Sequence, residues 1–222
     1  MNQMFKKMAF FSMGAFLGFS VITSPVSAEK KMEKMKTAVK MAQTGMIASV
    51  DVKTSSVKWL GKKVVGTHNG TIGIKEGSLN LEKGQIVGGS FTIDMTSIAC
   101  EDLKDAEYNG KLVGHLKSAD FFSVDKFPMA DFKIKSVTPK ISANNNVEIM
   151  GDLTIKGITK PLTFPASVSI EGKSVKAKAT AIAVDRTAYD IKYGSGKFFQ
   201  NLGDKMIDDQ FWLDIEIMAG VK

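Results

Sequence analysis

Arginine, histidine and cysteine are scarce in this 222-residue chain. Lysine and arginine together number 30, yet Arg186 is the only arginine, and the formal net charge is +7. Nucleic-acid readers depend on arginine for bidentate contacts, so a lysine-rich surface indicates a solvated coat and no nucleic-acid partner. Cys100 is the only cysteine, which excludes an intramolecular disulfide. We expect Cys100 to be a small buried hydrophobe and stability to come from the core.

The same scarcity limits metal and catalytic chemistry. His68 and His115 are the only histidines, and a zinc site built from them and Cys100 would have to recruit carboxylates. The sequence contains no HExxH, paired CxxC or GxSxG motif, and residues 194–197 lack the spacing of a phosphate-binding loop. Adjacent carboxylates such as Glu101-Asp102 are expected to be solvated loop charges. We therefore predict no catalytic set, no metal, no cofactor and no enzyme activity.

Residues 1–28 have the composition of a secretory signal peptide. Two lysines precede an apolar run at residues 8–22, and a Val-Ser-Ala sequence ends at Ala28. The apolar run is shorter than the roughly 20 residues that span a bilayer. We expect cleavage after Ala28 and a periplasmic location, or secretion where the source cell has no outer membrane.

Residues 29–45 are rich in lysine and methionine, with Met32, Met35 and Val39 at helical spacing. They form either an amphipathic helix that touches an anionic membrane surface or a linker that precedes the next domain. The weak apolar face favours the linker.

From residue 46 to residue 222 the hydrophobic period changes to two. Phe91, Ile93 and Met95 alternate with polar residues, as do the apolar residues of 211–217. Along residues 131–137, Phe132 and Ile134 lie on one face of a strand. The next residue on that face is either Ser136, if the alternation is regular, or Val137, if the alternation shifts by one residue. Such alternation is typical of antiparallel sheets with one dry face, and frequent Gly- and Asn-containing turns favour a barrel or a sandwich. We favour one all-β barrel, with one or two short helices between residues 100 and 122 that cap its end.

The strand at residues 175–184 indicates a lumen with free space. Val175 shares one face with four small residues, Ala177, Ala179, Ala181 and Ala183. An eight-stranded barrel is either just filled by side chains or holds one small ligand, so an inward alanine face predicts a cavity. The alternative is a solid barrel in which large residues of the opposite wall, such as Phe91 or Phe211, fill the space.

Arg186 follows this strand. It is either a polar latch for an anionic head group at the barrel mouth or a structural residue, paired with Asp185 or with a carboxylate of a neighbouring strand and stacked on Tyr189. We favour the structural role. His115 lies near Asp120, and a hydrogen bond between them either pins the helix or leaves His115 to contact a head group.

Three segments resemble the YceI-like family of lipocalin-like, polyisoprenoid-binding proteins. They are HLKSADFFSVDKFP at residues 115–128, GDLTIKGITKPLTF at 151–164 and VDRTAYDI at 184–191, and HNGTIGIKEGSL and FTIDMTSI also fit. The residues that match the family pattern are His68, Gly70, His115, Leu116, Phe121, Phe122, Pro128, Gly151, Leu153, Thr154, Gly157, Pro161, Asp185 and Arg186.

The resemblance implies an eight-stranded antiparallel barrel with a short helical insertion, whose lumen binds an isoprenoid or similar amphiphilic lipid for transport, storage or stress protection. The alternatives are an enzyme that acts on a lipid- or quinone-like substrate in the same cavity, or a stress or interaction protein with a solid barrel. Peripheral membrane contact and a homodimer are left open. The residues that we expect to contact the lipid are Phe91, His115, Phe121, Phe122, Phe132, Ala177, Ala179, Ala181, Arg186, Tyr189 and Phe211.

Overall fold

The computed structural model describes residues 32–33, 45–140, 142 and 144–221. The expected signal peptide, and all of residues 29–45 except 32–33 and 45, lie outside the described residues. The chain divides into two units, Met1–Val39 and Lys40–Lys222, and the strands belong to the second. None of the described helices has the length and apolar character needed to cross a membrane.

Strands dominate the described part of the chain, as the alternating pattern predicts. In order, the elements of the second unit are β1 (Met46–Val50), β2 (Ser56–Lys63), β3 (Gly66–Glu82), β4 (Gln85–Cys100), α2 (Ala106–Lys117), β5 (Met129–Pro139), β6 (Val147–Ile155), β7 (Ile158–Glu171), β8 (Ser174–Asp185), η1 (Arg186–Tyr189), η2 (Gly203–Lys205) and β9 (Ile207–Val221).

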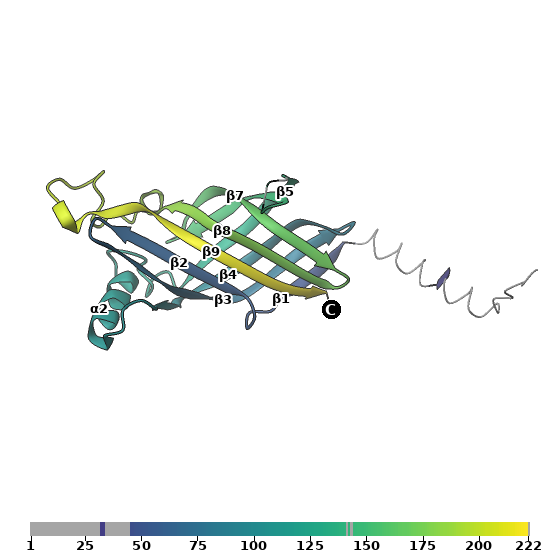
Figure 1. Ribbon diagram of the computed structural model, residues 1–222, viewed down its shortest axis with the longest axis horizontal. Coiled ribbons are helices and arrows are strands. Elements are labelled where there is room, and N and C mark those ends of the chain that lie inside the picture. Colours follow the sequence, from purple (N-terminus) through teal and green to yellow (C-terminus); the bar gives the residue numbers. More distant parts are fainter. Residues whose placement is uncertain (1–31, 34–44, 141, 143, 222) are drawn as a thin grey trace, which may run out of the picture. The chain divides into compact units, whose positions relative to one another are not determined.

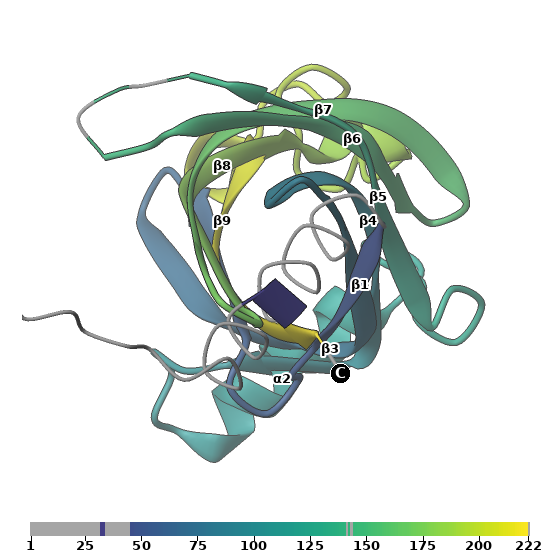
Figure 2. The same cartoon turned by 90° about the vertical axis from the view of Figure 1, so that its right-hand side faces the viewer.

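The strands form one antiparallel sheet that closes into a barrel, seen end-on in Figure 2. Its order is β3-β2-β9-β8-β7-β6-β5-β4, and pairing of β4 with β3 completes the ring. β1 and β2 both lie between β3 and β9, one after the other along the barrel. β2 pairs with the first part of β3 and of β9, namely with Gly66–Ile72 and Ile207–Glu216, and β1 pairs with the later residues of both strands. The ring therefore has eight positions, which confirms the predicted fold.

Helix α2 is the predicted helical insertion and lies at the end of the barrel where β9 begins, opposite β1 (Figure 1). Asp105 caps its N-terminus by accepting hydrogen bonds from the amides of Glu107 and Tyr108. The helix ends at Lys117, and the backbone amide of the C-cap residue Ser118 donates to the carbonyl of His115. None of its residues is fully buried, but Leu116 packs against the core cluster and so anchors the helix at this end of the barrel.

A β-bulge in β8 changes which alanines face the lumen. The pairing of β8 with β9 shifts register between Ala179 and Ile182, and Ala181 has a φ of 54°. A bulge adds one residue and reverses the alternation, so Ile182 is buried whereas Ala181 and Ala183 are exposed. The prediction of an inward alanine face is therefore right for Ala177 and Ala179 and wrong for Ala181 and Ala183.

A second register shift lies between Ile134 and Ser136 in β5, and it produces the one-residue change of alternation that was one of the two alternatives for residues 131–137. Beyond it Val137 packs against the core. The predicted inward face of residues 91–95 is correct, since Phe91, Ile93 and Met95 all pack in the core cluster.

The bulge generates a matched test on β8. Ala181→Val places a β-branched residue in the left-handed region and should lower the free energy of unfolding by about 1–3 kcal/mol. Ala183→Val changes an exposed strand position and should stay within about 0.5 kcal/mol of the parent. Urea unfolding of both variants measures the difference, and equal effects of the two substitutions would contradict the bulge.

Candidate functional site

The barrel lumen contains two adjoining cavities. The outer cavity, at the α2 end, has a volume of about 420 Å³, and the inner cavity has about 110 Å³. Val57, Ile93, Leu153 and Leu213 line both, so the two are successive sections of one lumen. The free space rules out a solid barrel in the described part of the chain.

The two sections differ in polarity. The inner cavity has an apolar lining, and Lys178, which is among the residues at its wall, is exposed on the outer face of β8. The outer cavity is apolar where it meets the inner one but also has polar and charged lining residues, namely Lys62, Lys63, His68, His115, Arg186, Lys205, Asp208 and Gln210. An amphiphile would therefore find a dry inner section and a polar outer end.

Nine of the eleven predicted contact residues line this lumen. His115, Phe121, Phe122, Arg186 and Phe211 line the outer cavity, and Phe91, Phe132, Ala177 and Ala179 line the inner one. Ala181 and Tyr189 line neither. Ala181 is turned outward by the bulge, and Tyr189 is packed in the core cluster, where burial raises the pKa of its hydroxyl to about 12.

Aromatic rings form the wall of the outer cavity beneath α2. The imidazole of His115 lies edge-on to the rings of Phe121 and Tyr193, with centroid distances of 4.9 and 4.6 Å. Its Nε2 is 3.3 Å from the carboxylate of Asp120, which confirms the predicted hydrogen bond. Helix α2 is thus joined to the loop that follows η1 through a ring contact at the cavity wall.

Arg186 is buried, and its guanidinium is held by the backbone. Nε donates to the carbonyl of Asp208 at 2.9 Å, Nη1 donates to those of Ile191 and Tyr193 at 2.9 and 2.8 Å, and Nη2 donates to that of Ile207 at 3.1 Å. These bonds tie the loop after η1 to the beginning of β9. Arg186 is therefore a structural residue, as favoured from the sequence, and little of its donor capacity remains for a head group.

The partners of Arg186 differ in part from those expected. Its ion-pair partner is Asp209 on β9, at 3.7 Å from Nη2, and the ring nearest to the guanidinium is that of Phe121 at 6.0 Å. Asp185, the other candidate, instead caps η1 and pairs with Lys197. Burial lowers the pKa of Arg186, although the nearby carboxylates oppose this shift.

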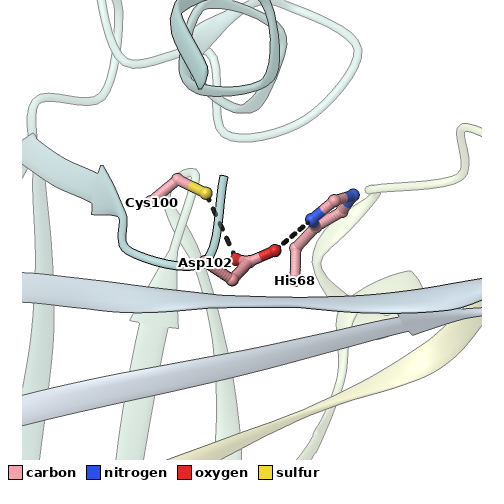
Figure 3. Close-up of side chains that lie close together, drawn as sticks. All are labelled: His68, Cys100 and Asp102. Atoms are coloured by element: carbon pink, nitrogen blue, oxygen red, sulfur yellow. Dashed lines mark hydrogen bonds and ion pairs between the residues drawn. The ribbon is translucent and has the colours of Figure 1, made fainter. Parts of the chain in front are cut away.

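A second polar cluster lies at the end of β4 and was missed in the sequence. Asp102 Oδ2 is 2.8 Å from His68 Nδ1, and Asp102 Oδ1 is 3.3 Å from Cys100 Sγ (Figure 3). Burial opposes ionisation of Asp102, but hydrogen bonds from the Asn69 amide, His68 and Cys100 outweigh it and lower the pKa of the carboxyl to about 2. Burial raises the pKa of the Cys100 thiol. Asp102 is thus no solvated loop charge, because it joins two side chains that lie 32 residues apart in the sequence.

Comparison with known proteins identifies the family of this chain. The model of the YceI-like domain matches residues 49–219. The chain belongs to the YceI-like family. Among relatives of this YceI-like protein, a UPF0312 protein of Pseudomonas putida is 44% identical over 59 residues, 27% of this chain and 30% of the relative. A UPF0312 protein of Staphylococcus aureus is 40% identical over 82 residues, 36% of this chain and 44% of the relative. The chain therefore matches less than half the length of these curated relatives.

Solved structures share the barrel of this YceI-like protein. The crystal structure of Burkholderia cenocepacia BcnA is 22% identical with a TM-score of 0.56, over 77% of this chain and 99% of that chain. A polyisoprenoid binding domain from Saccharophagus degradans is 11% identical with a TM-score of 0.57, over 80% of this chain and 99% of that chain. At these identities the common property is the fold.

The contacts of Arg186 predict a stability effect. Arg186→Met should lower the free energy of unfolding by about 2–4 kcal/mol, because it leaves buried carbonyls without their donor and removes the positive charge beside Asp209. Arg186→Lys should recover little of this, since one ammonium cannot reach four carbonyls. Lys197→Met removes the ion pairs of an exposed lysine with Asp185 and Asp209, and it should cost at most about 1 kcal/mol because the backbone contacts of Arg186 remain. Denaturant unfolding checks all three, and a parent-like Arg186→Met protein would contradict the structural role.

Proposed function

We propose that this YceI-like protein is a non-catalytic carrier that holds an isoprenoid or similar amphiphilic lipid in the barrel lumen. The observation that carries the proposal is the division of the lumen into an apolar inner section and a polar outer section. The tail lies along the inner section towards Phe91 and Phe132, and the head group lies among the polar residues at the α2 end.

Burial of the tail supplies the affinity. Each methylene removed from water contributes about 0.8 kcal/mol, so a few isoprene units offset the cost of ordering a flexible chain. The outer cavity alone falls within the volume range of small-molecule sites, which is about 300–1,000 Å³. The polyisoprenoid binding domain from Saccharophagus degradans has the same fold and supports this class of ligand.

Export and membrane contact complete the proposal. The signal-peptide pattern of residues 1–28 supports transfer to the periplasm, or secretion where there is no outer membrane. Exposed apolar side chains lie at the end of the barrel where the outer cavity is found, namely Val64, Val65, Phe198, Phe199 and Met206. Their exposure beside lysines supports transient contact with a membrane during lipid transfer. A homodimer stays a prediction.

Catalysis in the lumen has weaker support. His68 and His115 line the outer cavity, but each is paired with a carboxylate, Asp102 and Asp120 respectively. A further carboxylate, Asp190 at the end of η1, is exposed and paired with Lys192. Cys100 does not line the cavity. These pairings hold both imidazoles in place, which supports binding without turnover.

Native mass spectrometry of the purified protein tests the function directly. We expect an added mass that organic extraction releases as an isoprenoid-type lipid, and rebinding of solanesol, a long isoprenoid alcohol, after extraction. A protein that carries no lipid and does not bind solanesol would overturn the proposal.

A substitution in the inner cavity tests the position of the tail. Ala179→Phe fills space that the tail occupies and should weaken binding of solanesol by roughly 10–100-fold, while farnesol, a short isoprenoid alcohol, should bind nearly as before. Ala183→Phe, on the outer face of the same strand, is the matched control and should alter neither affinity. Calorimetric titration measures both, and equal losses for the two alcohols in Ala179→Phe would place the tail elsewhere.

A further inference from the structure

The cluster of His68, Cys100 and Asp102 brings three kinds of metal-ligating atom together. An imidazole nitrogen, a thiol sulfur and a carboxylate oxygen all lie within 4.8 Å of one another. The ligand atoms of a tetrahedral zinc ion, bound at about 2.0–2.3 Å, are separated by about 3.3–3.8 Å. Movements of a few tenths of an ångström up to about an ångström would therefore seat an ion among the three side chains.

The backbone holds these ligands close. In the β3–β4 pairing Gly70 lies opposite Cys100, and a Cβ at Gly70 would be 1.8 Å from the carbonyl oxygen of Ala99. Only a residue without a side chain permits this approach. It brings His68, two residues before Gly70, beside Asp102, two residues after Cys100.

The surroundings also support the ligands. The Asn69 amide donates to Asp102 Oδ1 at 2.8 Å and orients the carboxylate. The side-chain amide of Asn109 on α2 donates to the carbonyls of Cys100 and Leu103, both at 2.9 Å, and fixes the turn that carries the thiol and the carboxylate. Such outer contacts orient first ligands in known metal sites. Figure 3 shows the thiol and the imidazole on either side of the Asp102 carboxylate.

We propose that His68, Cys100 and Asp102 form a binding site for one divalent zinc-type ion. The mixture of nitrogen, sulfur and oxygen donors suits zinc better than magnesium or calcium, which prefer oxygen alone. The ion replaces the thiol proton, which passes to solvent, and water fills the fourth position. This proposal departs from the expectation of no metal, and it is independent of the proposed lipid function.

The site has a structural consequence at the mouth of the lumen. His68 lines the outer cavity, and Asn109 joins the turn of Cys100 to helix α2. A bound ion would crosslink β3 to that turn and so stabilise the wall on which α2 rests. Binding of zinc should therefore raise the unfolding temperature as well as occupy the site.

The experiment uses tag-free purified protein freed of metal with a chelator. Native mass spectrometry and calorimetry with Zn²⁺ alone should show one ion per chain. Co²⁺ in place of zinc should give a thiolate-to-cobalt charge-transfer band. Cys100→Ser should abolish this band and weaken zinc binding at least about 100-fold, more than the loss of an outer contact in known sites. Asp125→Asn, which alters an exposed carboxylate outside the cluster, is the matched control and should bind zinc as the parent does.

Two results would overturn the proposal. One is binding that is equally strong in Cys100→Ser and in the parent, since the ion would then lie elsewhere. The other is no stoichiometric binding to the parent, which would leave a hydrogen-bonded cluster only. Circular dichroism verifies that the variant folds. If it does not, alkylation of Cys100 in the unchanged protein decides, because bound zinc should slow the reaction and an unoccupied thiol should react at the same rate with or without zinc.

Discussion

Closure of the sheet between β3 and β4 is the constraint on which the rest of the molecule depends. Every strand then has two neighbours, and the ring of eight positions sets a width that side chains only just fill. β1 and β2 share one position, so β3 and β9 each run past two partners and extend over the length of the barrel. The lumen is long because these two strands are long, and small residues such as Ala177 and Ala179 line the wall of its inner section.

Much of this arrangement could be predicted from local patterns. Alternation along residues 91–95 and 211–217 identifies the inner faces, because the period of a strand is two wherever the strand is regular. The prediction failed at Ala181, where the period is broken by a bulge. Nothing in the sequence VKAKATAIAV marks that break, because it depends on a partner 33 residues away: the carboxylate of Asp214 on β9 accepts a hydrogen bond from the Ala181 amide at 2.7 Å. A register shift that depends on a neighbouring strand cannot be predicted from the alternation of residues within one strand.

The polar sites show the same limit. A structural role was favoured for Arg186 on the expectation of a salt bridge with a nearby carboxylate. Its four hydrogen bonds go instead to backbone carbonyls, which the sequence does not distinguish. Asp102 was predicted to be a solvated loop charge because it is adjacent to Glu101, a spacing that implies no acid–base chemistry. Its partners His68 and Cys100 become apparent only when the pairing of Gly70 with Cys100 is known. A polar cluster whose residues come from different strands can be predicted once the strand register is known, but not from the spacing of residues within one segment.

These features concentrate the polar structure at one end of the barrel. Arg186 fixes the loop after η1, the ring of His115 contacts both that loop and Phe121, and the Asp102 cluster braces the turn before α2. The opposite section has an apolar wall and lacks such networks among its lining residues. A barrel built in this way has a rigid polar mouth and a permissive apolar interior. Head-group selection would then depend on fixed geometry at the α2 end, whereas tail length would be limited only by the volume beyond Val57 and Leu213.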